Sequence, residues 1–334
     1  MTPRWRGCLI GAVVAGGLFV LGAAVFLTVL RAPAPPGERH PPATTTAPPT
    51  ASTAASPAAS PSLEIVAEER LDERRMELTL RSAALDDTTK VRLLLPTAWE
   101  TRRDWPSLWL LHGGLDDHTS WTARTDVEAL TRDSGLMVVM PDGGGCGSYS
   151  DWWNGGDGGP PRWETYHLRE LLPLLTARYR AGPDRAVAGY SMGGQGAMLY
   201  AAKGFFKAAA SFSGAVHILQ PGVPQAVMAG TTLGCLGTDW KRIWGEPEAQ
   251  RAIWRAHNPF HQAAHLKNVK LYVAAGAGDV VEDLANRAAR TFAARLEELG
   301  IPVRTHFYRG GHQHAFWQRE LHRAYPMLSE AIGG

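Results

Sequence analysis

The stretch Gly189-Tyr190-Ser191-Met192-Gly193-Gly194 decides the fold, because it follows the apolar run RAVAGY (185–190) and precedes a helical pattern. A serine flanked by glycines, on a sharp turn from a strand into a helix, is the G-x-S-x-G pattern of an exposed nucleophile. Larger flanking side chains would collide in so tight a turn. The helix that follows directs amides and a positive dipole end at the charge that forms on a substrate. Ser191 is therefore our candidate nucleophile.

From residue 63 onward, short β-rich runs alternate with longer helical patterns. Strands are predicted at 76–80, 91–95, 108–111, 136–140, 186–190, 208–212, 271–275 and 303–308, and helices at 163–179, 195–203, 284–300 and 316–332. This alternation predicts an α/β protein with the α/β-hydrolase fold, in which helices cover both faces of a mainly parallel sheet. The first two strands lack a helix between them and should form an antiparallel edge. Residues 214–265 show no clear period, and we expect an irregular, lid-like insert there.

The N-terminal region differs in composition from the rest of the chain. We place the catalytic domain at 63–334. Residues 8–30 carry no charge, and as a helix they would rise about 35 Å, enough to cross a bilayer. Arg4 and Arg6 precede the segment, so we expect 1–7 in the cytoplasm and the rest of the chain outside it. The alternative is a cleaved signal peptide and a secreted protein, but the apolar run is longer than usual for one. In residues 31–62, 27 of 32 positions are Pro, Ala, Ser or Thr, which predicts a disordered stalk.

The bulk composition excludes some classes of function. The chain has 334 residues and a formal net charge of +2, which gives no reason to expect nucleic acid as a partner. Its three cysteines are too few for a disulfide framework. Cys8 lies in the apolar segment, so only Cys146 and Cys235 are candidates for a bridge, and the sequence leaves open whether they pair. The sequence also leaves the oligomeric state open.

A serine nucleophile needs a base and an acid, which in this fold follow it in the order Ser, acid, His. His312 lies just after the last predicted strand, in Tyr308-Arg309-Gly310-Gly311-His312, and is the candidate base. The acid should follow the strand LYVAA (271–275). We favour Asp279 to orient the imidazole, and we keep Glu282 and its neighbour Asp283 as alternatives.

An oxyanion hole requires two backbone N–H groups. Met192, directly after the nucleophile, supplies one, and Gly114 in the turn LHGGL (111–115) is the candidate for the other. The polar cluster Asp116, Asp117 and His118 follows, and three polar residues on one loop are more often solvated than bound to metal. The Gly-rich stretch 143–147 lacks the Gly-Lys-Ser/Thr of a phosphate loop. We predict neither a metal nor a cofactor.

With these residues in place, the chain resembles the esterase D and antigen 85 mycolyltransferase family. The resemblance runs from about residue 76 to 330. It rests on LWLLHGG (108–114), GLMVVMPDGG (135–144), SYSDWW (148–153), RWETYHLRELLP (162–173), GYSMGGQGAM (189–198), KLYVAAGAG (270–278) and GGHQHAFWQREL (310–321). The mycolyltransferase branch uses a Glu that falls on Glu282, whereas the simple esterase branch uses an Asp that fits Asp279. The resemblance also assigns His112, Asp151, Trp152 and Trp153 to the substrate cleft, with Ser148 beside them.

Two departures bear on the reaction that the resemblance implies. The mycolyltransferases begin the oxyanion loop with an Asp that contacts the sugar, whereas this chain has His112, as simple esterases do. The disulfide loop typical of that branch is not evident. We therefore expect a membrane-bound, extracytoplasmic serine esterase or acyltransferase that acts on an acyl ester, of a lipid or a sugar for example. The alternatives are trehalose mycolyl transfer, a serine peptidase, and a catalytically silent surface binding protein.

Overall fold

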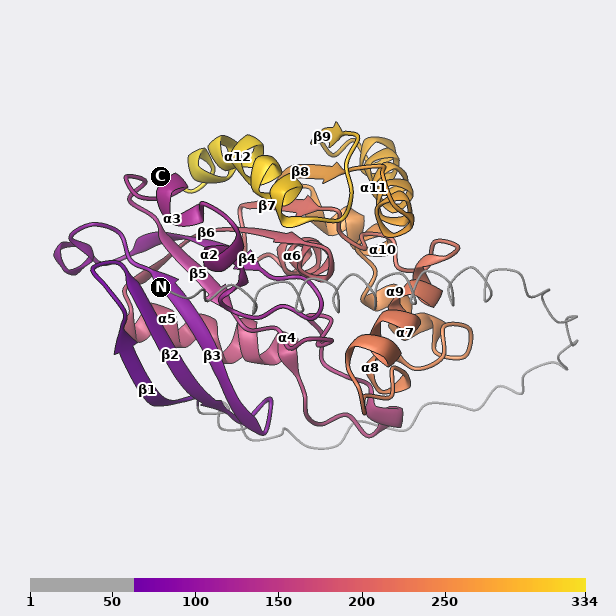
Figure 1. Cartoon of the computed structure of the whole chain (residues 1–334), viewed down its shortest axis with the longest axis horizontal. Coiled ribbons are helices and arrows are strands. Elements are labelled where there is room, and N and C mark those ends of the chain that lie inside the picture. Colours follow the sequence, from indigo (N-terminus) through magenta and orange to yellow (C-terminus); the bar gives the residue numbers. More distant parts are fainter. Residues whose placement is uncertain (1–62) are drawn as a thin grey trace, which may run out of the picture. The chain divides into compact units, whose positions relative to one another are not determined.

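The computed structural model describes residues 63–334, so the predicted tail, anchor and stalk lie outside the described residues. Within 63–334, no helix combines the length and the apolar character needed to cross a bilayer. One nine-stranded sheet has the order β1-β2-β3-β5-β4-β6-β7-β8-β9 (Figure 1). The strands are β1 (Glu64–Arg70), β2 (Arg75–Ser82), β3 (Asp87–Leu94), β4 (Trp105–Leu111), β5 (Met137–Pro141), β6 (Ala181–Tyr190), β7 (Ala208–Phe212), β8 (Lys270–Ala275) and β9 (Val303–Phe307).

Helices outside the 214–265 segment cover the two faces of the sheet. They are α2 (Ser120–Arg124), α3 (Val127–Leu130), α4 (Trp163–Thr165), the π-helix η3 (Tyr166–Leu171), α5 (Leu172–Arg178), α6 (Met192–Ala202), α11 (Val280–Glu298) and α12 (His314–Glu330). Side chains of η3, α5, α6 and α11 belong to one buried cluster, and those of α2, α3 and α12 belong to a second. Figure 1 shows α5 and α12 on opposite sides of the strands. This confirms the predicted α/β-hydrolase architecture.

The alternation along β4 explains why the central strands are apolar throughout. Trp109 and Leu111 enter the first cluster, whereas Leu108 and Leu110 enter the second. A parallel strand covered on both faces has no solvent side, so every residue of β4 is buried. β4 pairs in parallel with both β5 and β6. The pairs β6–β7, β7–β8 and β8–β9 are parallel as well.

The antiparallel edge contains one strand more than predicted. β2 and β3 pair antiparallel as expected, but β1 adds to β2 and β3 also pairs antiparallel with β5. β1 has the sequence EIVAEER and six of its seven residues are exposed. An exposed edge strand needs no apolar face, which is why its pattern gave no strand signal.

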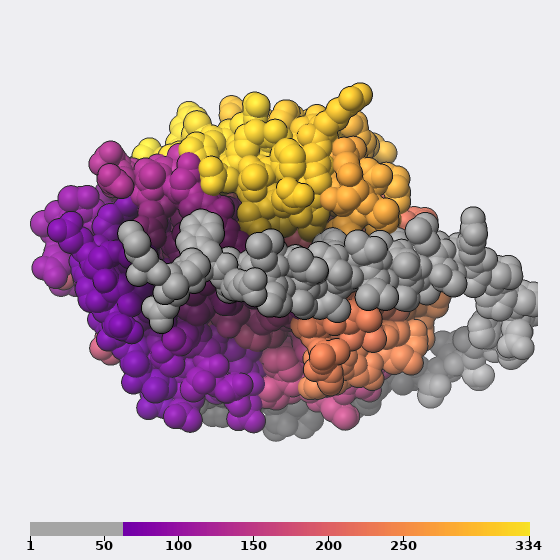
Figure 2. Space-filling view, viewed as in Figure 1, coloured from indigo at the N-terminus to yellow at the C-terminus, as the bar shows by residue number. Residues whose placement is uncertain are grey.

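The expectation of an irregular insert at 214–265 is partly wrong. The segment contains the helices α7 (Val223–Gly234), α8 (Lys241–Trp244), α9 (Arg251–Ala256) and α10 (Pro259–Gln262), followed by the 3₁₀ turn η4 (Ala263–Leu266). All but α7 are a turn or two long, too short to show a helical period. The predicted helix at 163–179 is likewise divided into α4, η3 and α5, because a π-helical stretch interrupts it. Figure 2 shows the insert, in orange, at the molecular surface.

Candidate active site

Ser191 lies at the turn between β6 and α6, with φ of 53° and ψ of −121°. The flanking glycines allow this strained turn. A Cβ on Gly189 would lie 2.2 Å from the carbonyl oxygen of Gly193, and a Cβ on Gly193 would lie 2.3 Å from that of Leu111. The start of α6 therefore packs directly on the end of β4, and Ser191 is held in a conformation that non-glycine residues rarely adopt.

His312 lies in the loop between β9 and α12, and its ring faces the nucleophile. The Nε2 atom lies 2.9 Å from Oγ of Ser191, although 121 residues separate the two. The indole of Trp317, in the first turn of α12, packs edge-on against the imidazole with ring centroids 4.8 Å apart. This geometry suits proton transfer from the serine hydroxyl to the imidazole.

Glu282 accepts the hydrogen bond from the other ring nitrogen of His312. Its Oε2 lies 2.7 Å from Nδ1, and the side chain is fully buried. Its Oε1 accepts two more hydrogen bonds, from the Ser213 hydroxyl at 2.5 Å and from the Gly276 amide at 2.5 Å. A buried carboxylate needs hydrogen-bond donors around its oxygens, and here three groups supply them.

The prediction that Asp279 orients the imidazole is wrong, because Asp279 contacts the backbone of His312 and not its ring. Its Oδ2 accepts the His312 amide at 2.8 Å. Its Oδ1 accepts the Glu282 amide at 2.8 Å, so Asp279 is the N-cap of α11. Asp283 is exposed. Of the three carboxylates that we considered, only Glu282 reaches the ring.

The sequence carried a signal for this assignment. Asp279-Val-Val-Glu282 ahead of a long amphipathic helix is the spacing of a helix start, with the N-cap residue followed three positions later by Glu. Asp279 uses one carboxylate oxygen for the cap and the other for the His312 amide, so neither oxygen bonds the imidazole. The glutamate of a capping pattern usually bonds back to the N-cap amide, whereas Glu282 turns into the protein interior towards Ser213.

The candidate oxyanion loop (112–118) follows β4 and lies against the nucleophile. A Cβ on Gly113 would be 3.3 Å from Cβ of Ser191. The Leu115 amide donates to the Gly145 carbonyl at 2.8 Å, which fixes the turn around Gly114. Within residues 63–334, neither the Gly114 amide nor the Met192 amide has a protein acceptor. Both remain available to an oxyanion.

The expectation that His112 lines the substrate cleft is contradicted by its burial, because only 1% of the residue is exposed. Its Nε2 accepts the Gly143 amide at 2.8 Å, and its Nδ1 lies 2.7 Å from the Gly113 carbonyl. Tyr149 donates its hydroxyl to the His112 carbonyl at 2.9 Å. His112 therefore supports the oxyanion loop from inside the protein.

The other residues assigned to the cleft are largely engaged in local structure. Asp151 accepts both the amide and the hydroxyl of Thr165, at 2.9 and 2.6 Å, and so fixes the start of η3. Trp152 is buried and donates its indole N–H to Gly147 at 3.1 Å. Trp153 is only half-buried, and its amide donates to Ile243 in α8. Ser148 is buried, and its amide contacts Sδ of Met192 at 3.4 Å.

Cys146 and Cys235 form a disulfide that joins this region to the insert. α7 ends at Gly234, where an added Cβ would lie 2.7 Å from Leu115, and it begins after Gly222, where an added Cβ would lie 2.8 Å from Leu284 in α11. α7 therefore runs from the helix that carries Glu282 to the oxyanion loop. The disulfide fixes its C-terminal end.

Metal ligands do not gather at the site. Across residues 63–334, no group of three or more His, Cys, Asp or Glu side chains is arranged to hold a metal ion. The expectation that the cluster at 116–118 is solvated is wrong for two of its members. Asp116 and His118 are mostly buried, and they bind Tyr190 and Glu77, respectively. Asp117 instead bonds within its own turn, to the amide and hydroxyl of Thr119.

The chain is similar in sequence to known esterases and acyltransferases. The sequence model of the "Putative esterase" family matches residues 82–328. An esterase of Mycobacterium tuberculosis is 33% identical over 265 residues, which cover 75% of this chain and 58% of that relative. The chain thus spans less than two thirds of that relative's length. The diacylglycerol acyltransferase/mycolyltransferase Ag85B of Mycolicibacterium smegmatis is 30% identical over 254 residues, covering 68% of this chain and 77% of that one.

Solved structures share the fold. MPT51 of Mycobacterium tuberculosis superposes with a TM-score of 0.64 at 24% identity, covering 75% of this chain and 95% of that one. An S-formylglutathione hydrolase of Agrobacterium tumefaciens superposes with a TM-score of 0.67 at 19% identity, covering 80% of this chain and 99% of that one. The family match spans most of the catalytic domain, including the loops that carry Ser191, Glu282 and His312. The chain therefore belongs to the esterase family that also contains the antigen 85 acyltransferases.

Proposed function

We propose that this chain is a serine esterase or acyltransferase that forms an acyl-enzyme on Ser191. The observation that carries the proposal is the continuous chain of contacts from Ser191 through His312 to Glu282, at 2.9 and 2.7 Å. Such a chain activates a hydroxyl that is otherwise a poor nucleophile. The family membership supports the same chemistry.

The reaction begins when Nε2 of His312 takes the proton of the Ser191 hydroxyl as Oγ attacks the ester carbonyl carbon. Negative charge moves to the carbonyl oxygen, where the amides of Gly114 and Met192 donate to it. His312 then gives its proton to the leaving alkoxide, and the alcohol departs. Glu282 holds the imidazole with Nε2 facing Ser191, and its charge stabilises the imidazolium that forms between the two proton transfers.

The acyl group leaves Ser191 by the reverse steps. His312 takes a proton from water or from an acceptor alcohol, the resulting oxygen nucleophile attacks the acyl carbonyl, and the proton returns to Ser191. Hydrolysis and transfer differ only in that acceptor. The relatives include both an esterase and a diacylglycerol acyltransferase/mycolyltransferase. Acyl esters of lipids or sugars are the proposed substrates, and transfer to trehalose is the alternative to hydrolysis.

The test is activity and labelling at Ser191. Wild-type protein should hydrolyse p-nitrophenyl esters and react with a fluorophosphonate probe, whereas Ser191→Ala should do neither above background. Ser134→Ala is the matched control, since Ser134 lies in a turn between α3 and β5 and should retain both properties. Labelling of another serine in wild-type protein would refute the assignment. Adding trehalose or a simple alcohol, and measuring the acylated acceptor by mass spectrometry, separates transfer from hydrolysis.

We also propose that residues 8–30 anchor the chain in a membrane, with the catalytic domain outside the cytoplasm. The uncharged segment and the preceding arginines support this topology. The disulfide between Cys146 and Cys235 supports it independently, since disulfides persist in oxidising compartments. The full chain should sediment with membranes in high salt, and protease added to intact cells should release the catalytic domain. Release by salt alone would contradict the anchor, and a mature N-terminus near residue 35 would support secretion.

A further inference from the structure

The carboxylate of Asp116 joins the oxyanion loop to two other segments of the site. Its Oδ2 accepts the Tyr190 hydroxyl at 2.7 Å. The same oxygen lies 3.3 Å from Nε2 of His314. Tyr190 is the residue before Ser191, and His314 follows His312 by two positions. The carboxylate of Asp116 therefore joins the oxyanion loop to the last residue of β6, next to the nucleophile, and to the first residue of α12, two positions after the base.

The Tyr190 ring is a fixed point for this contact. It stacks on Trp317 with centroids 4.3 Å apart and planes 9° apart. Trp121 packs edge-on against it at 4.9 Å. On a further side lies the backbone of the oxyanion loop, because a Cβ on Gly113 would be 2.7 Å from the ring. The ring is fully buried and cannot shift without moving these neighbours.

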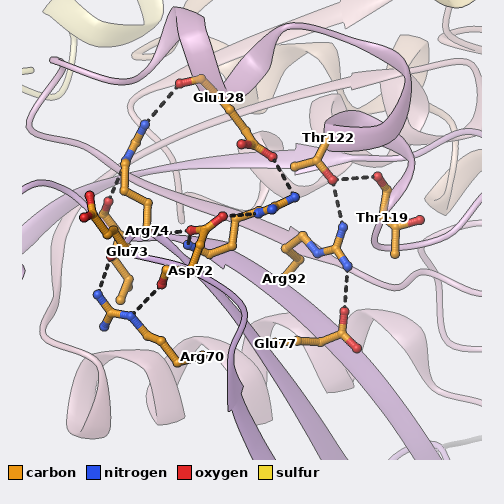
Figure 3. A network of polar contacts seen from close by, with 11 residues as sticks. Arg70, Asp72, Glu73, Arg74, Glu77, Arg92, Thr119, Thr122 and Glu128 are labelled. Carbon is orange, nitrogen blue, oxygen red and sulfur yellow. Dashed lines mark hydrogen bonds and ion pairs between the residues drawn. The ribbon is translucent and has the colours of Figure 1, made fainter.

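The far end of the oxyanion loop is fixed to the antiparallel strands rather than to the site. His118 contacts Glu77 of β2 at 3.1 Å. Figure 3 shows the adjoining contacts, in which Arg92 of β3 bonds both Glu77 and Thr122 of α2. Asp116 lies between this support and Gly114. It is therefore placed to determine how the donor end of the loop approaches Ser191.

The charges around Asp116 favour a lasting contact. Burial raises the pKa of Asp116, but hydrogen bonds from His314 and Tyr190 outweigh it and hold the pKa below its ordinary value. Burial and the neighbouring Asp116 charge together raise the pKa of Tyr190. Tyr190 thus keeps its proton and donates a hydrogen bond to a carboxylate that stays ionised, which gives a strong, charge-assisted hydrogen bond.

We propose that Asp116 is a positioning residue, which sets the approach of the Gly114 amide to Ser191 by tying the oxyanion loop to Tyr190 and His314. The inference rests on the proposed function, because the loop matters only if Gly114 serves an oxyanion. Loss of one oxyanion donor costs about 10²–10³-fold in kcat. A donor that is displaced rather than removed should cost less, about 10–100-fold.

The experiment compares Asp116→Ala, Asp116→Asn, Tyr190→Phe and the double variant Asp116→Ala/Tyr190→Phe in the full-length protein. Asp116→Ala should lower kcat for p-nitrophenyl esters by about 10–100-fold and change KM less than threefold, because the oxyanion forms only after binding. Asp116→Asn keeps the size of the side chain and should show an intermediate loss. The losses of Asp116→Ala and Tyr190→Phe should not add in the double variant, since both break the same contact. Additive losses would overturn the proposal.

Arg124→Ala is the matched control. Arg124 approaches the other oxygen of Asp116 at only 3.8 Å and is mostly exposed, so kcat should stay within twofold of wild type. Amide hydrogen exchange of the peptide covering 112–118 supplies a readout that needs no activity. Asp116→Ala should speed exchange there at least several-fold, with little change at α5. Unchanged exchange would overturn the positioning role whether or not the wild type hydrolyses esters. Faster exchange with kcat within twofold of wild type would overturn it as well.

Discussion

Glu282, in the first turn of α11, accepts a hydrogen bond from Nδ1 of His312, with Oε2 2.7 Å from that nitrogen. Asp279, one turn of chain earlier, holds the His312 amide at 2.8 Å and the Glu282 amide at 2.8 Å. The sequence offers both carboxylates as the acid that orients His312, but in the structure they have separate roles. Glu282 contacts the imidazole ring of His312, and Asp279 fixes the backbone amides of His312 and Glu282.

Substitutions at these two residues should have different effects. Glu282→Gln should lower kcat by about 10³–10⁴-fold with little change in KM, because the imidazole loses the partner that fixes its tautomer and stabilises its charge. Asp279→Ala should lower the free energy of unfolding by about 1 kcal/mol, because α11 loses the side chain that caps its N-terminus. Its effect on kcat should be far smaller than that of Glu282→Gln. Steady-state kinetics measure the losses in kcat and urea unfolding measures the losses in stability, and a larger kcat loss in Asp279→Ala than in Glu282→Gln would contradict the assignment.

The disulfide closes a long loop. Cys146 and Cys235 are 89 residues apart, and a loop of this length gives about 4–5 kcal/mol of stabilisation in the chain-entropy treatment, with 2–4 typical of measured bridges. The free energy of unfolding of the double variant Cys146→Ser/Cys235→Ser should therefore be lower by about 2–5 kcal/mol. The double variant should accordingly unfold at a lower urea concentration than the wild type. KM should rise as well, because the end of α7, which contacts Leu115 of the oxyanion loop, loses its covalent link to the 143–147 stretch.

A reducing agent provides the control for this prediction. Dithiothreitol should lower the stability of the wild-type protein towards that of the double variant and leave the double variant unchanged. Equal stability of the wild type and the double variant under oxidising conditions would contradict a stabilising bridge.

The elements that could be predicted from the sequence are those whose burial is visible in the local pattern of apolar residues. β7 begins and ends where predicted, because a strand buried on both faces is a continuous apolar run. β1 could not be predicted, because its residues face solvent and carry no such run. Ser191 and His312 are identifiable from short motifs at the ends of strands. Their 2.9 Å approach agrees with the order expected for the fold.

The residues that could not be assigned depend on distant partners. Glu282 is selected by Ser213 and Gly276, which the sheet brings beside it. The helix-start spacing marks Asp279 as an N-cap, but it does not show that Glu282 turns towards these two groups. His112 is buried because Tyr149, 37 residues away, closes over it. The pairing of Cys146 with Cys235 likewise depends on where α7 ends. Each of these contacts is a result of the tertiary fold.

A buried histidine makes the stability of the fold depend on pH. His167 in η3 is fully buried, with Nδ1 2.8 Å from the Tyr200 hydroxyl and Nε2 2.8 Å from the Asp142 carbonyl. Burial lowers the pKa of His167 to about 4, so the ring is neutral at neutral pH. The carbonyl can only accept, so Nε2 carries the single proton of the neutral ring and Nδ1 accepts from the tyrosine.

The sign of the effect follows from comparing the two states. In the unfolded chain this histidine takes up a proton near pH 6.5, whereas in the folded protein it does so only near pH 4. Between these values the unfolded state binds more protons, so stability falls as the pH is lowered through this window. For His167 the slope reaches about 1.4 kcal/mol per pH unit, and the total loss approaches about 3 kcal/mol by pH 4. Urea unfolding at a series of pH values from 7 to 4.5 measures it. His167→Gln should lower the slope of unfolding free energy against pH by close to the contribution of one proton, about 1.4 kcal/mol per pH unit, whatever the stability of the variant at pH 7. The control His265→Gln, at an exposed position, should keep the wild-type slope. Parallel slopes for the wild type and His167→Gln would mean that the imidazole is not kept neutral by the fold.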